Sequence, residues 1–292
     1  GYGKEGTVMM AEIQYEDIDL YHYTSLASLF AILQNETIRL TDYRFLNDTQ
    51  ELSYATHWLK ALLQPMAENE FVQKLLTAIE NIEQGKVERL KGIGEDLPYL
   101  QWNMCDLNYY ILSLSQNYDD LAMWRMYAKD GCSIKFNSQK LNEFLYSLRD
   151  DNLKNGFTNL IKGPVSYNAG QDMDTVIKLW LVLHNEQMIY DDVLQYCLRI
   201  KSPDFSFEHE YRFGIPFEDQ YLGEKATKEF TLVGNTIRPQ LELKKFPVAD
   251  VIEEITISPF VTSELTKIGL QELLKSKNMS PDIVKQSSIK IR

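Results

Sequence analysis

The sequence predicts a single α+β domain built on a central mixed or antiparallel sheet with helical insertions. Short runs of apolar and β-branched residues recur along the chain, as in IDLYHY at 18–23 and NYYILSLS at 108–115, and they are typical of strands. Between them lie runs with apolar residues at i, i+3, i+4 and i+7, which predict helices. No internal repeat or low-complexity linker divides the 292 residues, so we expect one domain.

The first strand and helix illustrate how each element is assigned. Residues 18–23 form the strand, and Thr24 or Ser25 is a natural N-cap for a helix that ends near Asn35. The apolar face of that helix consists of Leu26, Leu29, Phe30 and Leu33. The same reasoning predicts further strands at 37–41, 108–115, 132–137, 162–167, 211–217, 236–248, 253–259 and 287–292. Further helices are predicted at 49–65, 69–90, 120–130, 174–200 and 262–276.

The domain is expected to cover residues 18–292, with helical insertions near 52–105 and 172–200. Residues 1–17 are interpreted as an N-terminal extension, part of it a cloning remnant before Met9 or Met10. That extension lacks the apolar stretch of a secretory signal. No run approaches 18 apolar residues, so we expect no membrane span and no membrane partner.

The composition of the chain indicates which binding partners and which cellular compartment to expect. The formal net charge of −12 disfavours binding to long nucleic acid, which requires clustered cationic charge. The cysteines Cys105, Cys132 and Cys197 are odd in number and far apart, which indicates neither a disulfide framework nor a zinc site. A reducing cytoplasm fits this pattern, so a cytoplasmic location is expected.

His22 is the first candidate functional residue, because it lies between a strand and a helix. From a strand end its imidazole can project into a cleft and hydrogen-bond a ribose hydroxyl. The alternative is that His22 hydrogen-bonds a neighbouring carbonyl and only supports the fold. The local sequence by itself favours the structural alternative.

The segment FEHEYR at 207–212 holds the second candidate pair. In a strand, Glu208 and Glu210 point to one face and His209 to the other. Two carboxylates on one face repel, so one of them can have a raised pKa, or one can act as a base or electrostatic anchor while the other orients a substrate. The alternative is an edge strand whose charges are solvated, with Arg212 forming an ion pair.

Other residues gather near these motifs without a recognisable catalytic pattern. Ser113 and Ser115 lie on one face of the strand at 108–115, and either line a cleft or allow close packing. Trp124 and Tyr127 share a helix face, which is more often core than a ligand site. No phosphate-binding glycine loop, serine-hydrolase elbow or metal motif is present, and no metal ligand is predicted. The cations that can neutralise a small phosphorylated ligand are Arg39, Arg44, Arg125, Lys201 and Arg212.

The chain resembles the bacterial domain-of-unknown-function family 2971. The resemblance rests on YHYTSLASLFAILQNETIRLTDYRFLNDTQE at 21–51, ILSLSQNYDDLAMWRMYAKDGCSIKF at 111–136 and KSPDFSFEHEYRF at 201–213. The ending, from EEITISPF at 253–260 to SSIKIR at 287–292, is similar as well. The resemblance covers nearly the whole chain, and the two helical insertions are least constrained.

The opening and the Glu block also resemble the ADP-ribosyltransferase superfamily, in particular its His-Tyr-Glu type. This resemblance implies a split ADP-ribosyltransferase-like sheet and NAD as a substrate, with no metal. It implies that His22, Tyr23 and Thr24 bind the NAD ribose and the nicotinamide amide. It implies that Glu210, with Glu208 beside it, holds a ribose hydroxyl and stabilises the developing cation. The remaining residues implied to bind NAD are Tyr43 or Tyr127 as the stacking aromatic, Arg44, Ser113 and Ser115.

The function expected first is therefore an NAD-dependent mono-ADP-ribosyltransferase, in the setting of a bacterial toxin or a phage-defence effector. The second hypothesis is a noncatalytic nucleotide or phosphosugar sensor that uses the same cleft. The third is an interaction protein whose working surface is its acidic exterior. A macromolecular acceptor is not identified. His22 and Glu210 are expected to face one cleft if the first hypothesis holds, and positions on opposite faces of the sheet would exclude it.

Overall fold

The computed structural model describes residues 17–46, 49–84, 107–152, 160–186, 189–218 and 223–291. Its strands are β1 (Leu20–Ser25), β2 (Ile38–Asp42), β3 (Leu107–Ser115), β4 (Gly131–Phe136), β5 (Ile161–Pro164), β6 (Glu210–Glu218), β7 (Ala226–Val233), β8 (Thr236–Leu243), β9 (Ile252–Ile257) and β10 (Val284–Gln286). Its α-helices are α1 (Leu26–Asn35), α2 (Thr49–Leu63), α3 (Glu70–Glu83), α4 (Leu121–Tyr127), α5 (Ser138–Asn152), α6 (Ala169–Leu183), α7 (Ile189–Cys197), α8 (Val248–Val251) and α9 (Glu264–Ser276). Short 3₁₀ helices span Tyr43–Phe45, Gln64–Met66, Pro203–Glu208 and Pro281–Ile283.

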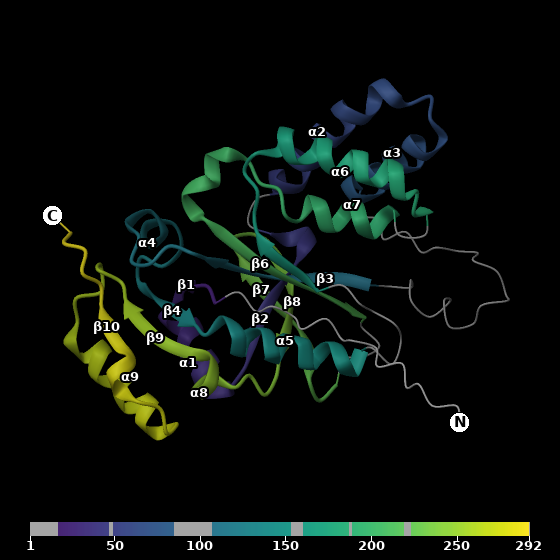
Figure 1. The fold of residues 1–292 in the computed structure, drawn as a ribbon. Helices are drawn as coiled ribbons and strands as arrows, with labels where there is room; N and C mark the ends of the chain where they lie inside the picture. Colours follow the sequence, from purple (N-terminus) through teal and green to yellow (C-terminus); the bar gives the residue numbers. More distant parts are fainter. Residues whose placement is uncertain are drawn as a thin grey trace, which may run out of the picture.

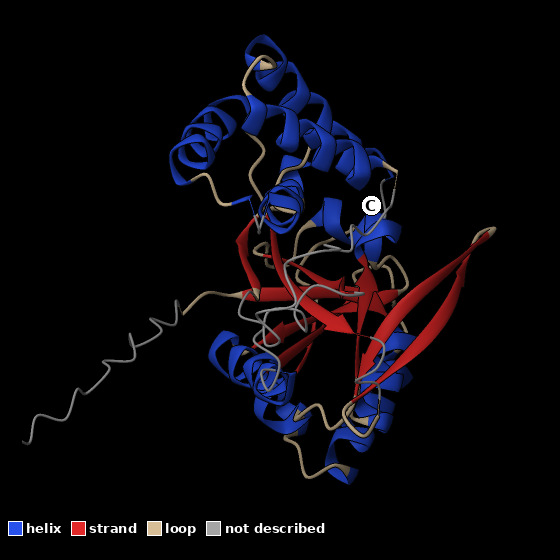
Figure 2. Ribbon diagram, turned by 90° about the vertical axis from the view of Figure 1, so that its right-hand side faces the viewer, coloured by secondary structure: helices blue, strands red, loops and turns tan. Residues whose placement is uncertain are grey.

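The described strands form one mixed sheet between two groups of helices. The strand order is β10-β9-β4-β1-β3-β2-β8-β7, with β6 paired to β3 and β5 paired to β6. All these pairs are antiparallel except β10 with β9. Helices α2, α3, α6 and α7 lie on one side of the sheet, and α1, α5, α8 and α9 on the other (Figures 1 and 2). The expected α/β composition and mixed sheet are therefore confirmed.

Strand β3 has a break in the pairing along one of its edges. Its other edge pairs with β6 over the full length, from Leu107↔Glu218 to Ser115↔Glu210. On the broken edge, β1 pairs only at Tyr21↔Ser115, and β2 pairs only at Ile111 and Tyr110. Among the described strands, none pairs with residues 112–114 of that edge. The sheet therefore opens between β1 and β2.

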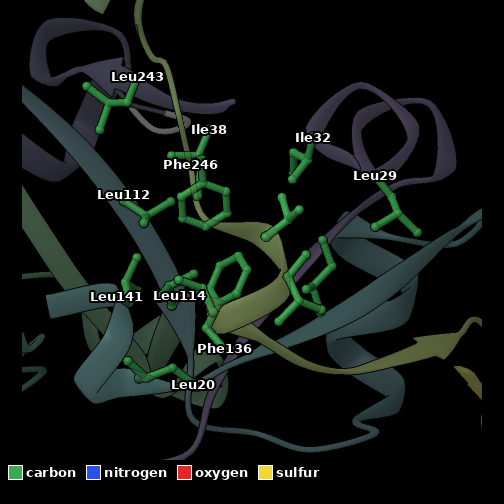
Figure 3. Packing of buried hydrophobic residues seen from close by; sticks show 14 of the residues in the cluster. Leu20, Leu29, Ile32, Ile38, Leu112, Leu114, Phe136, Leu141, Leu243 and Phe246 are labelled. Atoms are coloured by element: carbon green, nitrogen blue, oxygen red, sulfur yellow. The ribbon is translucent and has the colours of Figure 1, made fainter. Parts of the chain in front are cut away.

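Two hydrophobic cores cover the two faces of the sheet. Below it, alternate residues of β1, β3 and β4 pack against α1 and α5, as Leu20, Leu112, Phe136 and Leu141 do in Figure 3. Above it, the odd residues Tyr109 and Ile111 of β3 pack against the helices α2, α3, α6 and α7. Burial of each large aliphatic side chain contributes about 1.5–3 kcal/mol to folding.

Some sequence expectations differ from the structure in informative ways. The run SSIKIR at 287–292 was expected to be a strand, but β10 ends at Gln286, and Ser287 and Ser288 instead hydrogen-bond the side chain of Asp119. The single long helix expected at 174–200 is two helices, α6 and α7. Helix α5 and strand β7 had no predicted counterpart. The expected N-terminal extension falls on residues 1–17, of which 1–16 lie outside the described part of the chain.

Glycine 131 is required where β4 starts against β1. A Cβ added there would lie 2.0 Å from the carbonyl oxygen of Thr24, a backbone atom that cannot rotate away. We expect Gly131→Ala to force β4 away from β1 and to lower the free energy of unfolding by ~1–3 kcal/mol, as measured by urea unfolding.

The matched control is the same substitution at Gly269 within α9. Nothing lies within 4 Å of a Cβ at that position. Gly269→Ala should therefore raise the free energy of unfolding by about 0.5–1 kcal/mol, because alanine favours the helix. Equal effects of the two substitutions would contradict the steric explanation.

Candidate functional site

A cleft lies where the sheet opens between β1 and β2. It has a volume of about 180 Å³, enough for roughly a dozen water-sized groups. Strands β1, β2, β3 and β6, helix α4 and the first turn of α2 supply its walls. Of the residues implied to bind NAD or to act on it, the cleft is lined by His22, Tyr23, Ser113, Ser115, Tyr127, Glu208 and Glu210. Three of the predicted cations also line it, namely Arg39, Lys201 and Arg212.

Five charged side chains form a buried ion network in the wall of this cleft. The network consists of Glu51, Lys201, Glu208, Glu210 and Arg212, and each residue is 5% exposed or less. The Lys201 ammonium lies 2.6 Å from Glu208, 2.9 Å from Glu51 and 3.3 Å from Glu210. With all five in their usual charged forms, the network carries one net negative charge.

Arg212, on strand β6, binds two of the three glutamates of the network. Its Nε donates to Glu210 Oε1 at 2.5 Å, and its Nη2 donates to Glu51 Oε2 at 2.6 Å and to Glu210 Oε2 at 3.0 Å. Another bond from Arg212 goes to the carbonyl of Leu198 at 2.9 Å. Such charge-assisted bonds compensate the large cost of removing ions from water.

A backbone kink at His209 brings the two glutamates together. Glu208 ends the 3₁₀ helix Pro203–Glu208, His209 adopts a left-handed conformation with φ 40°, and Glu210 starts β6. The expectation that Glu208 and Glu210 share one face of a regular strand was therefore wrong. Both carboxylates nevertheless contact Lys201, because the kink redirects the chain between them. A left-handed residue that is not glycine costs about 1–2 kcal/mol. Two hydrogen bonds help to hold His209: its imidazole Nδ1 bonds the Asn117 Oδ1, and its carbonyl accepts from the Gln116 N–H.

Glu210 is held in its ionised form. Burial opposes its ionisation, but the charges of Arg212 and Lys201 and a hydrogen bond from Ser113 outweigh that effect and lower its pKa to about 2. The sequence had allowed for a raised pKa at one of the paired glutamates, from repulsion between them. The structure gives Glu210 the opposite shift, because two cations lie closer to it than the sequence could indicate.

His22 is neutral and is bound to the broken edge of β3. Burial lowers the pKa of its imidazole to about 4, and a hydrogen bond to the Ser113 backbone only partly opposes this shift. On β1, His22 lies opposite Ile134, on the sheet face that also carries Leu20 and Phe136. Glu210 lies opposite Ser115, on the other face. His22 and Glu210 thus lie on opposite faces by strand register, the arrangement that was expected to exclude a transferase. Both nevertheless line one cleft, because the sheet is open there.

The hydroxyl groups that line the cleft differ in whether other residues already bind them. Ser115 is buried and donates to the Glu208 carbonyl at 2.6 Å, and the hydroxyl of Tyr23 joins the backbones of Asn117 and Asp120. Ser113, in contrast, is exposed in the cleft, and the Tyr127 hydroxyl donates to Glu208. Burial and the negative charge of Glu208 raise the pKa of Tyr127, so it stays protonated.

Three predicted binding residues do not line the cleft. Tyr43 is buried in the upper core. Arg44 is engaged with Asp42 through its Nε at 3.0 Å and a terminal nitrogen at 2.7 Å, and both Tyr43 and Arg44 line a separate cavity. Thr24 is half-buried on β1 and is not part of the cleft wall. Of the two candidates for the stacking aromatic, Tyr127 lies in the cleft and Tyr43 does not.

Glu51 is the network residue that the sequence did not identify as functional. It lies in the first turn of α2. Its partner Arg212 is 161 residues away, and no local signal indicates such a pair. No group of three or more His, Cys, Asp or Glu in the described ranges is arranged to hold a metal ion.

Comparison with known proteins gives one match, which covers part of the chain. A family model described as "Protein of unknown function (DUF2971)" matches residues 123–213. The match covers less than half of the chain, and it supports the predicted resemblance to that family over this stretch, which includes Tyr127 and four of the five network residues. No curated protein and no solved structure matched the chain. In the part of the chain that the structure describes, no helix has the length and apolar character to cross a bilayer.

The imidazole of His22 should make stability depend on pH in a defined window. Its pKa is about 4 in the folded protein and about 6.5 when unfolded, so only the unfolded chain binds a proton there between these values. Stability is therefore expected to fall as the pH is lowered from about 6.5 to 4. His22→Gln should flatten this slope in urea unfolding at stepped pH, and an unchanged slope would contradict the assignment.

Glu210 should make stability depend on pH over a lower pH range than His22 does. Its carboxylate stabilises the fold fully above its ordinary pKa of 4.5, and this contribution is lost as the pH falls towards about 2. Glu210→Gln should therefore be much less stable than the wild type at pH 7, and the difference should shrink at pH 3. Urea unfolding of both proteins at the two pH values measures this, and a difference that stays constant would refute it.

Proposed function

We propose that the protein cleaves the nicotinamide–ribose bond of NAD and transfers ADP-ribose to a nucleophile. The observation that carries this proposal is a buried, ionised Glu210 in a cleft at a break in the sheet. Neutral His22, Tyr127 and the exposed Ser113 line the same cleft. A split ADP-ribosyltransferase-like arrangement of the sheet is part of this proposal.

The proposed reaction requires negative charge rather than a proton donor. The electron pair of the C1′–N bond passes to the positively charged nicotinamide nitrogen, and neutral nicotinamide leaves. The ribose becomes an oxocarbenium-like cation, a lone pair of the nucleophile forms the new bond at C1′, and the proton of the nucleophile is released to water. A fixed carboxylate beside C1′ stabilises the developing cation, and preorganised charge of this kind typically contributes 10²–10³-fold in rate.

The tyrosine and the histidine have supporting roles in this proposal. Tyr127 presents its ring to the cleft and keeps its proton, which suits a surface for stacking the nicotinamide. His22 is neutral and fixed by Ser113, so it can hydrogen-bond a ribose hydroxyl without adding positive charge next to the developing cation. A positively charged imidazole at this position would repel the developing cation and slow the reaction.

A second function is favoured by the pairing of Glu210. Both of its oxygens are already bound by Arg212 or Lys201, which reduces the field that the carboxylate can exert on a ligand. A noncatalytic sensor would use the same cleft to bind a nucleotide or a phosphosugar without breaking a bond. The two functions differ in one measurable product, free nicotinamide.

The test is incubation of the purified chain with NAD and quantification of released nicotinamide by liquid chromatography. Glu210→Gln keeps the shape and removes the charge, so release should fall by about 10²–10³-fold. The matched control is Glu272→Gln, the same chemical change on the exposed surface of α9, which should release nicotinamide at the wild-type rate. Folding of each variant is checked by circular dichroism and by its urea midpoint.

A second variant protects the test against misfolding of Glu210→Gln. Ser113→Ala removes an exposed hydroxyl that bonds Glu210, so it should fold normally and lose roughly tenfold in rate. Wild-type protein that binds NAD in calorimetry without releasing nicotinamide would replace the transferase by the sensor. A folded Glu210→Gln variant with the wild-type rate would remove Glu210 from the mechanism.

A further inference from the structure

The charges of the cleft are arranged unevenly along it. The ion network, with its net negative charge, lies at the end formed by β6 and α2. At the opposite end is Arg39 on β2, beside Thr41 two residues further along the same strand. In the row Thr41–Ile111–Gly214, β2 and β6 flank β3, so the backbones of β2 and β6 lie two strand spacings, about 10 Å, apart at this row.

The two network cations are not available to a bound anion. Lys201 is surrounded by three carboxylates, and Arg212 is bound by Glu210, Glu51 and a carbonyl. A phosphate near them would have to displace a carboxylate from a buried ion pair, and it would meet the net negative charge of the whole network. Lys201 and Arg212 were predicted to neutralise a phosphorylated ligand, and their contacts instead assign them to the internal carboxylates.

Arg39 is the remaining predicted cation in the wall of the cleft. Its side chain is 45% exposed, and its Nε donates to Glu242 Oε2 at 2.7 Å. Its two terminal nitrogens have no recorded partner among the described residues. These nitrogens form the planar fork that suits phosphate oxygens. Arg44 is engaged with Asp42, and Arg125 does not line the cleft.

From this polarity we infer that Arg39 is the diphosphate-binding residue of the cleft and that Glu242 tunes it. The inference rests on the proposed function and adds the direction in which the ligand lies. The cationic nicotinamide end of NAD lies against the Glu network, and the diphosphate lies over β2, where the terminal nitrogens of Arg39 and the hydroxyl of Thr41 bind its oxygens. Glu242 competes with the diphosphate for the same guanidinium.

This arrangement predicts opposite effects for two substitutions that each remove one charge. Arg39→Gln should weaken the binding of ADP-ribose about tenfold, because a charge-assisted bond to phosphate is lost. Glu242→Gln should strengthen the binding two- to threefold, because the competing carboxylate is gone. Isothermal titration calorimetry with ADP-ribose as the probe measures both effects without any turnover. Nicotinamide riboside, which has no diphosphate, should bind all three proteins equally.

Kinetics provide the second readout. In nicotinamide release from NAD, Arg39→Gln should raise KM about tenfold with little change in kcat, because the diphosphate bond is the same in the ground state and the transition state. Arg238→Gln removes the same charge from β8 outside the cleft wall and serves as the matched control, with unchanged KM. The effect of Arg39→Gln should also shrink at high salt, since the side chain is partly exposed.

The outcomes separate this inference from the proposed function. ADP-ribose binding that is the same for wild type, Arg39→Gln and Glu242→Gln would overturn the role of Arg39, even if nicotinamide release is confirmed. Opposite shifts in binding without any nicotinamide release would support the role of Arg39 in a sensor and overturn the transferase. Equal weakening of nicotinamide riboside and ADP-ribose by Arg39→Gln would show a general disturbance of the cleft and overturn the assignment. A wild-type protein that binds neither ligand would overturn both.

Discussion

The buried ion network of Glu51, Lys201, Glu208, Glu210 and Arg212 is the interaction on which the arrangement of the cleft depends. Its members come from α2, from the segment after α7, from the residue before the kink at His209 and from β6. An unpaired ion at such a depth would cost several kcal/mol, so each carboxylate requires a cation and each cation requires carboxylates. The position of the upper helices over β6 is thereby coupled to the ionisation of the cleft wall.

The same network restricts the chemistry that the cleft can perform. A carboxylate with a pKa of about 2 stays ionised near neutral pH and is a weak base, so Glu210 is suited to electrostatic stabilisation and poorly suited to act as a general base. A cationic ligand group or a developing cation is compatible with the net negative charge of this wall. An anionic group is directed to the other end of the cleft, where the exposed cation of β2 lies. The proposed transferase and the sensor share this polarity and differ only in whether a bond breaks.

The break in the sheet explains why His22 can be both structural and functional. Residues 112–114 of β3 have an edge without a strand partner among the described strands, and a backbone carbonyl at such an edge requires a donor. The imidazole of His22 supplies that donor to Ser113 and thereby lies in the opening itself. The structural and the functional interpretation of His22 therefore describe one arrangement, in which the bond that fixes the ring also presents it to the cleft.

The sequence by itself determined the elements whose signal is local. Alternation identified β1 and β3, helical periodicity identified α1 and α9, and the segment around Glu208 and Glu210 was identified as a candidate site by its density of charge. Strand β7 had no predicted counterpart; it lies at the edge of the sheet, and most of its side chains are not buried. Helix α5 was missed although Leu141, Phe144, Leu145 and Leu148 lie at i, i+3, i+4 and i+7, the spacing that predicts a helix. Only the tertiary structure decided which charges meet, because Glu51 and Arg212 are brought together over 161 residues of chain. The resulting ion pairs keep Glu210 ionised and engage Lys201 and Arg212, so that of the predicted cations in the cleft wall only Arg39 is left for a ligand in the proposed function. No local sequence pattern encodes these pairs, because electrostatic pairing depends on distance in space.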